Sequence, residues 1–254
     1  CLVSLSPDGG DAVAVREFSI PHKTFVKNGF ELPVAKNEVS WINADTIYVG
    51  TDFGPGSMTE SSYPRIVKQW RRGTPLSAAA TVYEGKPDDL AVSAFHDLTP
   101  GYERDFVAVA KDFFHAQMFL RNGNKLTRVD VPTDASADAH REWLLVQTRS
   151  PWTTGGTTYA SGTLLAARFD DFMAGKRQFT VLFKPDEHTA LSGYAWTRHH
   201  LILDVLDDVK SRLEVLTPPQ MAGPDSGWQP RVLPGAPALS TVSVVDTDPD
   251  HSDE

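Results

Sequence analysis

Cysteine is almost absent from this sequence of 254 residues, in which Cys1 is the one example. A single cysteine cannot form an intrachain disulfide, so the class of small folds stapled by disulfides is excluded. The same scarcity permits a reducing compartment, and we expect a cytoplasmic location. Long hydrophobic runs are missing too, since no apolar stretch approaches the roughly 18 residues of a membrane-spanning helix. We therefore expect no membrane partner.

Basic residues are also in short supply. Lys and Arg total 24 against 33 Asp and Glu, which leaves a formal net charge of -9. Because nucleic acids require a basic footprint on the protein, we expect no nucleic-acid partner. Hydrophobic residues still make up 41% of the chain and charged residues 22%. That balance is typical of a globular protein rather than a disordered one.

Helical periodicity is a third absence, since no long segment holds apolar residues at the spacing of a helix. Instead, short runs rich in Val, Ile, Leu, Phe and Tyr are separated by Gly, Pro, Asn and Asp. This pattern predicts an all-β protein. The five clearest predicted strands resemble one another and are Leu2–Leu5, Ile47–Gly50, Phe106–Val109, Leu144–Gln147 and Leu201–Asp204.

The spacing of these strands indicates a repeated unit. They start 45, 59, 38 and 57 residues apart, in the range expected for the four-stranded antiparallel blades of a β-propeller. We predict a single β-propeller domain over residues 1–254, with about five blades in this chain. The predicted blades cover about 2–33 together with 239–246, then 34–85, 90–132, 133–185 and 188–234. Within 34–85 the strands are expected at 39–42, 46–51, 65–71 and 81–84.

Both ends of the sequence are interpreted as parts of blades. Residues 2–33 offer three strands without an innermost one, whereas Thr241–Val245 offers an innermost strand with nothing after it. Because unpaired strand edges seek partners, we expect the C-terminal strand to complete the N-terminal blade and close the ring. An open arc or a strand-swapped dimer is the alternative. The chain also starts without Met, and we expect it to be cut from a longer protein.

Several stretches between Leu2 and about Asp246 carry a resemblance to a known family. They are Leu5–Gly9 followed by Val15–Phe18, Val39–Ile42 leading to Gly50–Arg65, then Gly73–Pro75, Thr148–Ser150 and Asp207–Leu213. In their order along the chain and in their residues, these stretches resemble the propeller of the prolyl oligopeptidase family. The last stretch is the most specific of them.

This resemblance implies a seven-bladed propeller that caps an α/β-hydrolase domain carrying a Ser, Asp and His triad. The serine of such a domain stands on a G-x-S-x-G turn. No such motif occurs in this sequence, and the nearest imitation, Gly54–Ser57, lacks the required glycine spacing. We therefore expect the chain itself not to be catalytic.

The partners that the resemblance implies are the protein's own C-terminal hydrolase domain and short peptide substrates. The parent protein would be a serine-type oligopeptidase that hydrolyses short, proline-containing peptides. The propeller would gate and filter access to the catalytic groups, because a narrow or hinged entrance admits a flexible peptide but not a folded domain.

Three residues are candidates for binding substrate. Arg149 matches a family arginine on the propeller face toward the active site, and a surface arginine paired with a carboxylate is the alternative. Trp41 and Ile47 fall near the family position of an apolar residue that touches substrate. For both of them, ordinary core packing between blades is the favoured alternative.

No metal or other cofactor is expected. The eight histidines are scattered without partners at zinc-ligand spacing. Asp246, Asp248 and Asp250 alternate like the start of a calcium loop, but His251 stands where the turn requires glycine. A catalytic triad of Ser93, His96 and Asp97 is not favoured either, since triads are recognised by geometry rather than by closeness in sequence.

Two other classes of function remain open. A free-standing propeller would act as a protein- or peptide-binding module, with a native chain ending near Glu254. A metal-dependent propeller hydrolase would need carboxylates or histidines converging on the central channel, which the predicted inner strands do not obviously supply.

Overall fold

The computed structural model describes residues 1–208, 210–219, 227–235 and 240–253. Its described helical elements are short: a 3-10 turn, η1 (Leu76–Ala78), and a five-residue helix, α1 (Phe169–Met173). None of the described helices is long and apolar enough to cross a membrane. The remaining regular structure is antiparallel β-sheet, mostly in sheets of four strands. The all-β prediction is therefore confirmed.

The chain divides into two compact units, residues 1–134 and residues 135–254. The division falls between two sheets and cuts through neither. Such a boundary is natural where every sheet packs mainly on its neighbours in sequence. Each unit is described by itself below, and a single closed domain stays a prediction.

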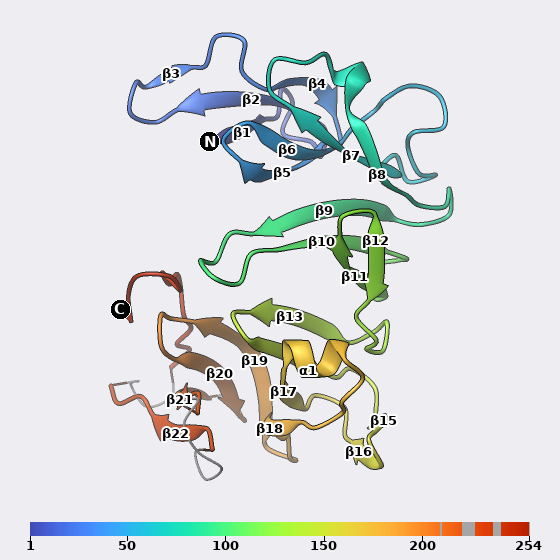
Figure 1. Cartoon of the computed structure of the whole chain (residues 1–254). Helices are drawn as coiled ribbons and strands as arrows, with labels where there is room; N and C mark the ends of the chain where they lie inside the picture. Colours follow the sequence, from blue (N-terminus) through green and yellow to red (C-terminus); the bar gives the residue numbers. More distant parts are fainter. Residues whose placement is uncertain (209, 220–226, 236–239, 254) are drawn as a thin grey trace. The chain divides into compact units, whose positions relative to one another are not determined.

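Residues 1–134 contain three four-stranded sheets (Figure 1). The first sheet is formed by β1 (Leu2–Leu5), β2 (Val13–Ser19), β3 (Thr24–Phe25) and β4 (Glu31–Ala35). The second is formed by β5 (Glu38–Asn43), β6 (Thr46–Gly50), β7 (Ile66–Arg71) and β8 (Ala80–Glu84). The third is formed by β9 (Ala91–Asp97), β10 (Arg104–Ala110), β11 (Ala116–Asn122) and β12 (Lys125–Arg128).

In the second and third sheets the strands lie side by side in chain order. The four strands predicted within 34–85 are all present, and their ends differ from the prediction by one residue at most. A tight turn forms at Asn122-Gly123, since Asn122 pairs with Lys125 and Gly123 has a φ of 59°. Glycine adopts this left-handed conformation without steric cost.

Residues 135–254 contain two four-stranded sheets and one extra hairpin. The fourth sheet is formed by β13 (Ser136–His140), β14 (Trp143–Gln147), β17 (Leu164–Arg168) and β18 (Thr180–Phe183). The hairpin is formed by β15 (Trp152–Thr154) and β16 (Thr157–Tyr159), inserted between β14 and β17. The fifth sheet is formed by β19 (Thr189–Trp196), β20 (Leu201–Asp207), β21 (Lys210–Thr217) and β22 (Gln229–Val232).

The second strand of the second sheet and that of the fourth sheet are covered on both faces. In β6, the side chains of Ile47 and Val49 pack toward the first sheet, and Tyr48 packs between the second and third sheets. All three are at most 1% exposed. Strands buried on both faces need nearly continuous hydrophobic sequence. This requirement explains why Ile47–Gly50 and Leu144–Gln147 were among the clearest strands in the sequence.

The two ends of the chain differ from the prediction. The first sheet has one strand more than the three predicted, because the two-residue strand β3 pairs with the end of β2, whereas β1 and β4 pair with its opposite edges. Residues 240–246 are assigned no strand, and residue 239 lies outside the described residues. The backbone carbonyl of Ser240 instead accepts a hydrogen bond from Ser211 at the start of β21, 3.2 Å away. Closure of a ring by this segment is therefore not seen and stays a prediction.

Candidate functional site

A four-stranded meander has two ends, and in the second and fourth sheets the connection at one end is much longer than the connection at the other. At one end the first strand turns into the second; we call this the short-turn end, with residues 44–45, 98–103, 141–142 and 197–200. At the other end the second strand leads into the third; we call this the long-loop end, with residues 51–65, 111–115 and 148–163.

Three of the family-like stretches lie at the long-loop end, and they include Asp207–Leu213, the most specific one. Gly50–Arg65 and Thr148–Ser150 begin where β6 and β14 end, and Asp207–Leu213 spans the connection from β20 to β21. Loops carry function when a rigid scaffold positions them. The long-loop ends of the sheets in each unit are therefore candidate functional surfaces.

Buried threonines anchor two of these loops at equivalent positions. Thr51 and Thr148 each follow the last residue of a second strand and are 0% and 2% exposed. The hydroxyl of Thr148 donates to the carbonyl of Ala160 at 2.7 Å and accepts the amide of Thr163 at 3.1 Å. Thr51 donates to the side-chain oxygen of Asn37 at 2.5 Å. Because buried polar groups are costly when unpaired, these bonds hold the loops in one conformation.

Ser57, the nearest imitation of a nucleophile in the sequence, is part of the loop framework. It is 3% exposed, and its hydroxyl donates to the carbonyl of Gly54 at 2.6 Å. The same oxygen accepts the amide of Phe53 at 2.8 Å. These bonds close the turn and leave the hydroxyl buried, so Ser57 is a structural serine.

Arg149 lies at the long-loop end, directly after Thr148. Its backbone is fixed, because its carbonyl accepts a hydrogen bond from the hydroxyl of Ser161. The residue is exposed. The structure thus presents Arg149 on a firmly held loop, and its contact with substrate stays a prediction.

Ile47 and Trp41 lie opposite each other in the β5–β6 ladder. Ile47 is 0% exposed and belongs to the core cluster of the first two sheets, which matches the core interpretation. Trp41 is half-buried, with its ring edge-on to Phe30 at 5.7 Å. It also lines a cavity of about 440 Å³ at the short-turn end, together with Arg72.

An ion pair closes one side of that cavity. Arg72 donates to both carboxylate oxygens of Glu17, at 2.7 and 2.9 Å. This bidentate bond, with help from the amide of Phe30, lowers the pKa of Glu17. Both charges are satisfied within the protein, so the cavity offers a ligand mainly its apolar wall at Trp41.

The candidate residues lie at different ends of their own sheets. Trp41 lies toward the short-turn end of the second sheet, whereas Arg149 lies at the long-loop end of the fourth sheet. The sequence alone does not reveal this difference, because it depends on the order of the strands in each sheet.

Two functional candidates were missed by the sequence analysis. Phe113 and Phe114 lie in the turn between β10 and β11 at the long-loop end, and their exposed fractions are 81% and 66%. Exposed large apolar side chains that stand together mark contact sites more often than isolated ones do. The available signal was a pair of adjacent phenylalanines immediately after Asp112, at a turn between two strands.

The turn that carries this pair is rigid. One carboxylate oxygen of Asp112 accepts the amides of Phe114 at 2.7 Å and His115 at 2.9 Å. The other lies 2.8 Å from the His115 ring. The amide of Phe114 and the His115 ring lower the pKa of Asp112. The two phenylalanines are thus held outward by local bonds.

His96 and Asp248 each take part in a polar contact with a neighbouring side chain. His96 contacts Asp105 at 2.9 Å, and Asp105 also accepts the hydroxyl of Tyr48 at 2.7 Å. The bond from Tyr48 ties the second sheet to the third, and burial together with Asp105 raises the pKa of Tyr48. Asp248 contacts His251 at 3.0 Å. Nowhere in the described part of the chain do three potential metal ligands gather.

Comparison with known proteins gives two curated relatives that are named as uncharacterized peptidases. An uncharacterized peptidase of Sinorhizobium fredii is 32% identical over 268 residues, a match that covers 100% of this chain and 35% of the relative. A structure of a post-proline cleaving enzyme from Rickettsia typhi matches with a TM-score of 0.81 and 27% identity, over 91% of this chain and 36% of that one. No family model matches the chain.

A more distant match has the same fold. The structure of a prolyl endopeptidase aligns with a TM-score of 0.65 at 13% identity, over 87% of this chain and 33% of that one. The chain spans about a third of the length of the curated relatives that it matches. Sequence likeness along the whole chain and the succession of four-stranded sheets agree, and the chain has the fold of the propeller part of prolyl oligopeptidases.

Proposed function

We propose that this chain filters the substrates of a peptidase whose catalytic groups lie in another part of the protein. The long-loop end faces that part and the incoming peptide. One observation carries this proposal: Phe113 and Phe114 stand exposed on a rigid turn at the same end of the sheets as the family-like loops. An exposed apolar pair held on a rigid turn suits contact with a peptide or with an adjacent domain that covers the two rings.

The chemistry of the whole protein follows the family. We propose a serine-type peptidase with a C-terminal α/β-hydrolase domain, which hydrolyses short peptides. The Rickettsia typhi enzyme is described as post-proline cleaving, and we propose the same preference here. Size selection follows because a short peptide can enter between the sheets and the catalytic groups, whereas a folded domain cannot.

The full-length protein tests the filter directly. One prolyl sequence is offered twice, as a short chromogenic peptide and within a surface loop of a folded protein. We expect hydrolysis of the peptide and no measurable hydrolysis of the loop. Equal rates on both would reject the filter, and turnover by a pure sample of the 254-residue chain would reject catalysis elsewhere.

Two substitutions test the long-loop end. Arg149→Ala should lower kcat/KM about tenfold if its guanidinium binds the peptide, the usual scale for losing a charged hydrogen bond. The matched control is Arg231→Ala, since Arg231 is exposed on the outer strand β22. Equal kinetics in the two variants would dismiss the role of Arg149.

Replacing Phe113 and Phe114 by serine should raise KM and leave the free energy of unfolding unchanged, because both rings are already exposed.

A binding module is the second candidate, and the exposed phenylalanine pair supports it equally well. In that case the long-loop end would recruit a separate protein or peptide. The reading frame beyond Glu254 discriminates the two: a continuation containing a G-x-S-x-G motif favours the peptidase, and an immediate stop favours the module.

A further inference from the structure

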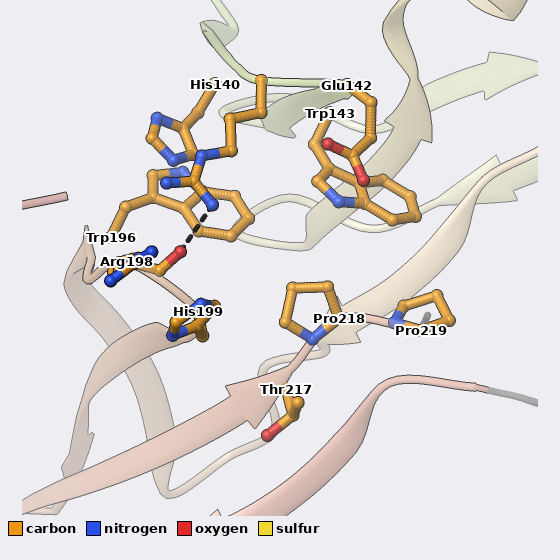
Figure 2. A pocket seen from close by; sticks show the side chains of 10 residues that line it. His140, Glu142, Trp143, Trp196, Arg198, His199, Thr217, Pro218 and Pro219 are labelled. Carbon is orange, nitrogen blue, oxygen red and sulfur yellow. Dashed lines mark hydrogen bonds between the residues drawn. The ribbon is translucent and has the colours of Figure 1, made fainter. Parts of the chain in front are cut away.

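A second pocket lies at the short-turn end of the fourth and fifth sheets, within the unit of residues 135–254. Its volume is about 290 Å³, near the lower limit of small-molecule pockets. Figure 2 shows the rings of Trp143 and Trp196 on one side and Pro218 and Pro219 on the other. The pocket belongs to neither the long-loop end nor the cavity beside Trp41.

The floor of the pocket is apolar and firmly packed. Trp143 and Trp196 are 7% and 9% exposed, and each ring contacts Trp228, with centroids 5.0 and 6.0 Å apart. His140 stacks on Trp196 at 4.6 Å. Aromatic and proline walls lose little conformational entropy when a ligand binds. Such a floor suits an aromatic or prolyl side chain.

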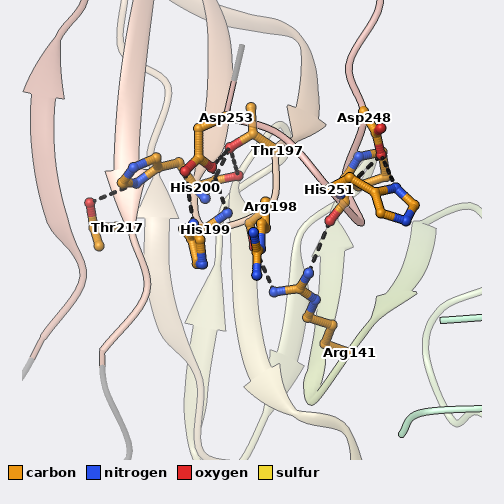
Figure 3. A network of polar contacts seen from close by, with 10 residues as sticks. Arg141, Thr197, Arg198, His199, His200, Thr217, Asp248, His251 and Asp253 are labelled. Atoms are coloured by element: carbon orange, nitrogen blue, oxygen red, sulfur yellow. Dashed lines mark hydrogen bonds and ion pairs between the residues drawn. The ribbon is translucent and has the colours of Figure 1, made fainter. Parts of the chain in front are cut away.

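The rim of the pocket is polar, and much of it is already engaged. Glu142 pairs with Arg168 at 3.2 Å. The guanidinium of Arg141 donates to the carbonyls of Arg198 at 2.6 Å and Pro249 at 3.0 Å. The ring of His199 contacts Asp253 at 2.8 Å. These bonds fix the shape of the rim, as Figure 3 shows for Arg141, His199 and Asp253.

Hydrogen-bonding capacity remains on one cation of the rim. Arg198 is exposed, and its guanidinium has no hydrogen bond or ion pair with any residue that the structure describes. Its backbone is held in place, because its amide donates to Ser252 at 2.8 Å. An arginine offers five donors and no acceptor, and its fork matches a carboxylate. The chemistry left over at the rim therefore selects an anion.

We propose that this pocket binds the free C-terminal end of a short peptide whose last residue is prolyl or aromatic. The ring would rest against Trp143 and Trp196, and the carboxylate would pair with Arg198. The choice of a peptide among carboxylates rests on the proposed function, because each hydrolysis step creates a new peptide C-terminus. The pocket would thus sense the products or the ends of peptides, away from the long-loop end of its own sheets.

The test uses ¹⁹F NMR of the full-length protein labelled with 5-fluorotryptophan. The Trp196 resonance is assigned from the spectrum of Trp196→Phe. The probes are N-acetyl-Gly-Phe and N-acetyl-Gly-Pro as free acids, with their C-terminal amides as controls. We expect the acids to shift the Trp196 resonance and the amides to shift it little. Arg198→Gln should weaken the binding of the acids about tenfold, and the matched variant Arg231→Gln should bind as the unchanged protein does.

Three results would overturn the inference. They are equal shifts by acid and amide, unchanged binding in Arg198→Gln, and no shift at about 10 mM peptide, beyond the range of useful affinity. Hydrolysis is measured separately, on the chromogenic peptide. A protein that binds the acids without cleaving peptides would refute the proposed function alone, and one that cleaves without the Trp196 shift would refute only this site.

Discussion

Two turns in this protein are each fixed by an aspartate and a histidine, but over very different distances in sequence. In the third sheet, Asp112 bonds to residues two and three positions later, at the long-loop end. In the fifth sheet, the turn at the short-turn end is fixed by Asp253, which contacts His199 across 54 residues. The first turn is self-sufficient, whereas the second depends on a distant segment returning to it.

The two turns also differ in the side chains that they expose or fasten. The self-sufficient turn holds two phenylalanines outward, where a partner can reach them. In the other turn, Asp253 also accepts the Thr197 hydroxyl at 2.9 Å and the His199 amide at 2.8 Å, so the last described segment is fastened to the fifth sheet (Figure 3). Hydrogen bonds between neighbouring residues can hold an exposed turn without help from the rest of the chain. Hydrogen bonds between distant residues hold two segments of the chain together.

The largest effect is expected at the buried anchor of the long-loop end. Thr148→Val keeps the shape of the side chain but removes the hydroxyl bonds to Ala160 and Thr163. The free energy of unfolding should fall by about 1–3 kcal/mol, the cost of leaving buried partners unpaired. Chemical denaturation measures it, with the exposed Thr157→Val as the control, expected within about 0.5 kcal/mol of the unchanged protein. A loss of stability no larger than that of the control would mean that the Thr148 hydroxyl does not stabilise the loop after β14.

A smaller effect should separate the two aspartate turns. Asp253→Ala should speed amide hydrogen exchange about fivefold at both Thr197–His200 and residues 248–253, because the bond joins the two segments. Asp112→Ala should speed exchange only within residues 111–115. If Asp253→Ala affected only its own neighbours, the contrast between local and long-range anchoring would fail.

The smallest effect is the response to acid. Hydrogen bonds from the His199 ring, the His199 amide and Thr197 lower the pKa of Asp253 from 3.8 to about 2. Since the folded value is the lower one, the stabilisation is present above about pH 4 and is lost as the pH falls toward 2. The amide resonance of His199 should therefore shift with a midpoint near pH 2. A midpoint near 3.8 would show that the contact does not persist in solution.

Much of the sheet structure could be predicted from the sequence, because strands buried on both faces require uninterrupted hydrophobic residues. The runs at 47–49 and 144–146 are 0–1% exposed and could hardly form anything else. The turn at Gly123 was equally readable, since its conformation is a property of the residue itself. The strand pairing at the N-terminal end could not be predicted. The residues of β4 are typical of any strand, and its pairing with β2 depends on which segments lie close together in the folded protein.

The candidate sites were less predictable than the fold. The sequence grouped Trp41 with Arg149, although strand order assigns them to different ends of their sheets. The sequence also did not single out Phe113 and Phe114, because the exposure of a side chain depends on what packs around it and not on the residue type. The pocket at Trp143 and Trp196 draws its residues from two sheets and could not be seen in either one.

The amino-acid sequence alone determined the class of structure and the position of most strands and turns, because these depend on hydrophobic alternation and on residues such as glycine acting locally. Only the tertiary structure decided which side chains share a surface, which polar groups are already satisfied and which remain available. Those outcomes depend on contacts between residues far apart in the chain, and such contacts exist only once the sheets have packed.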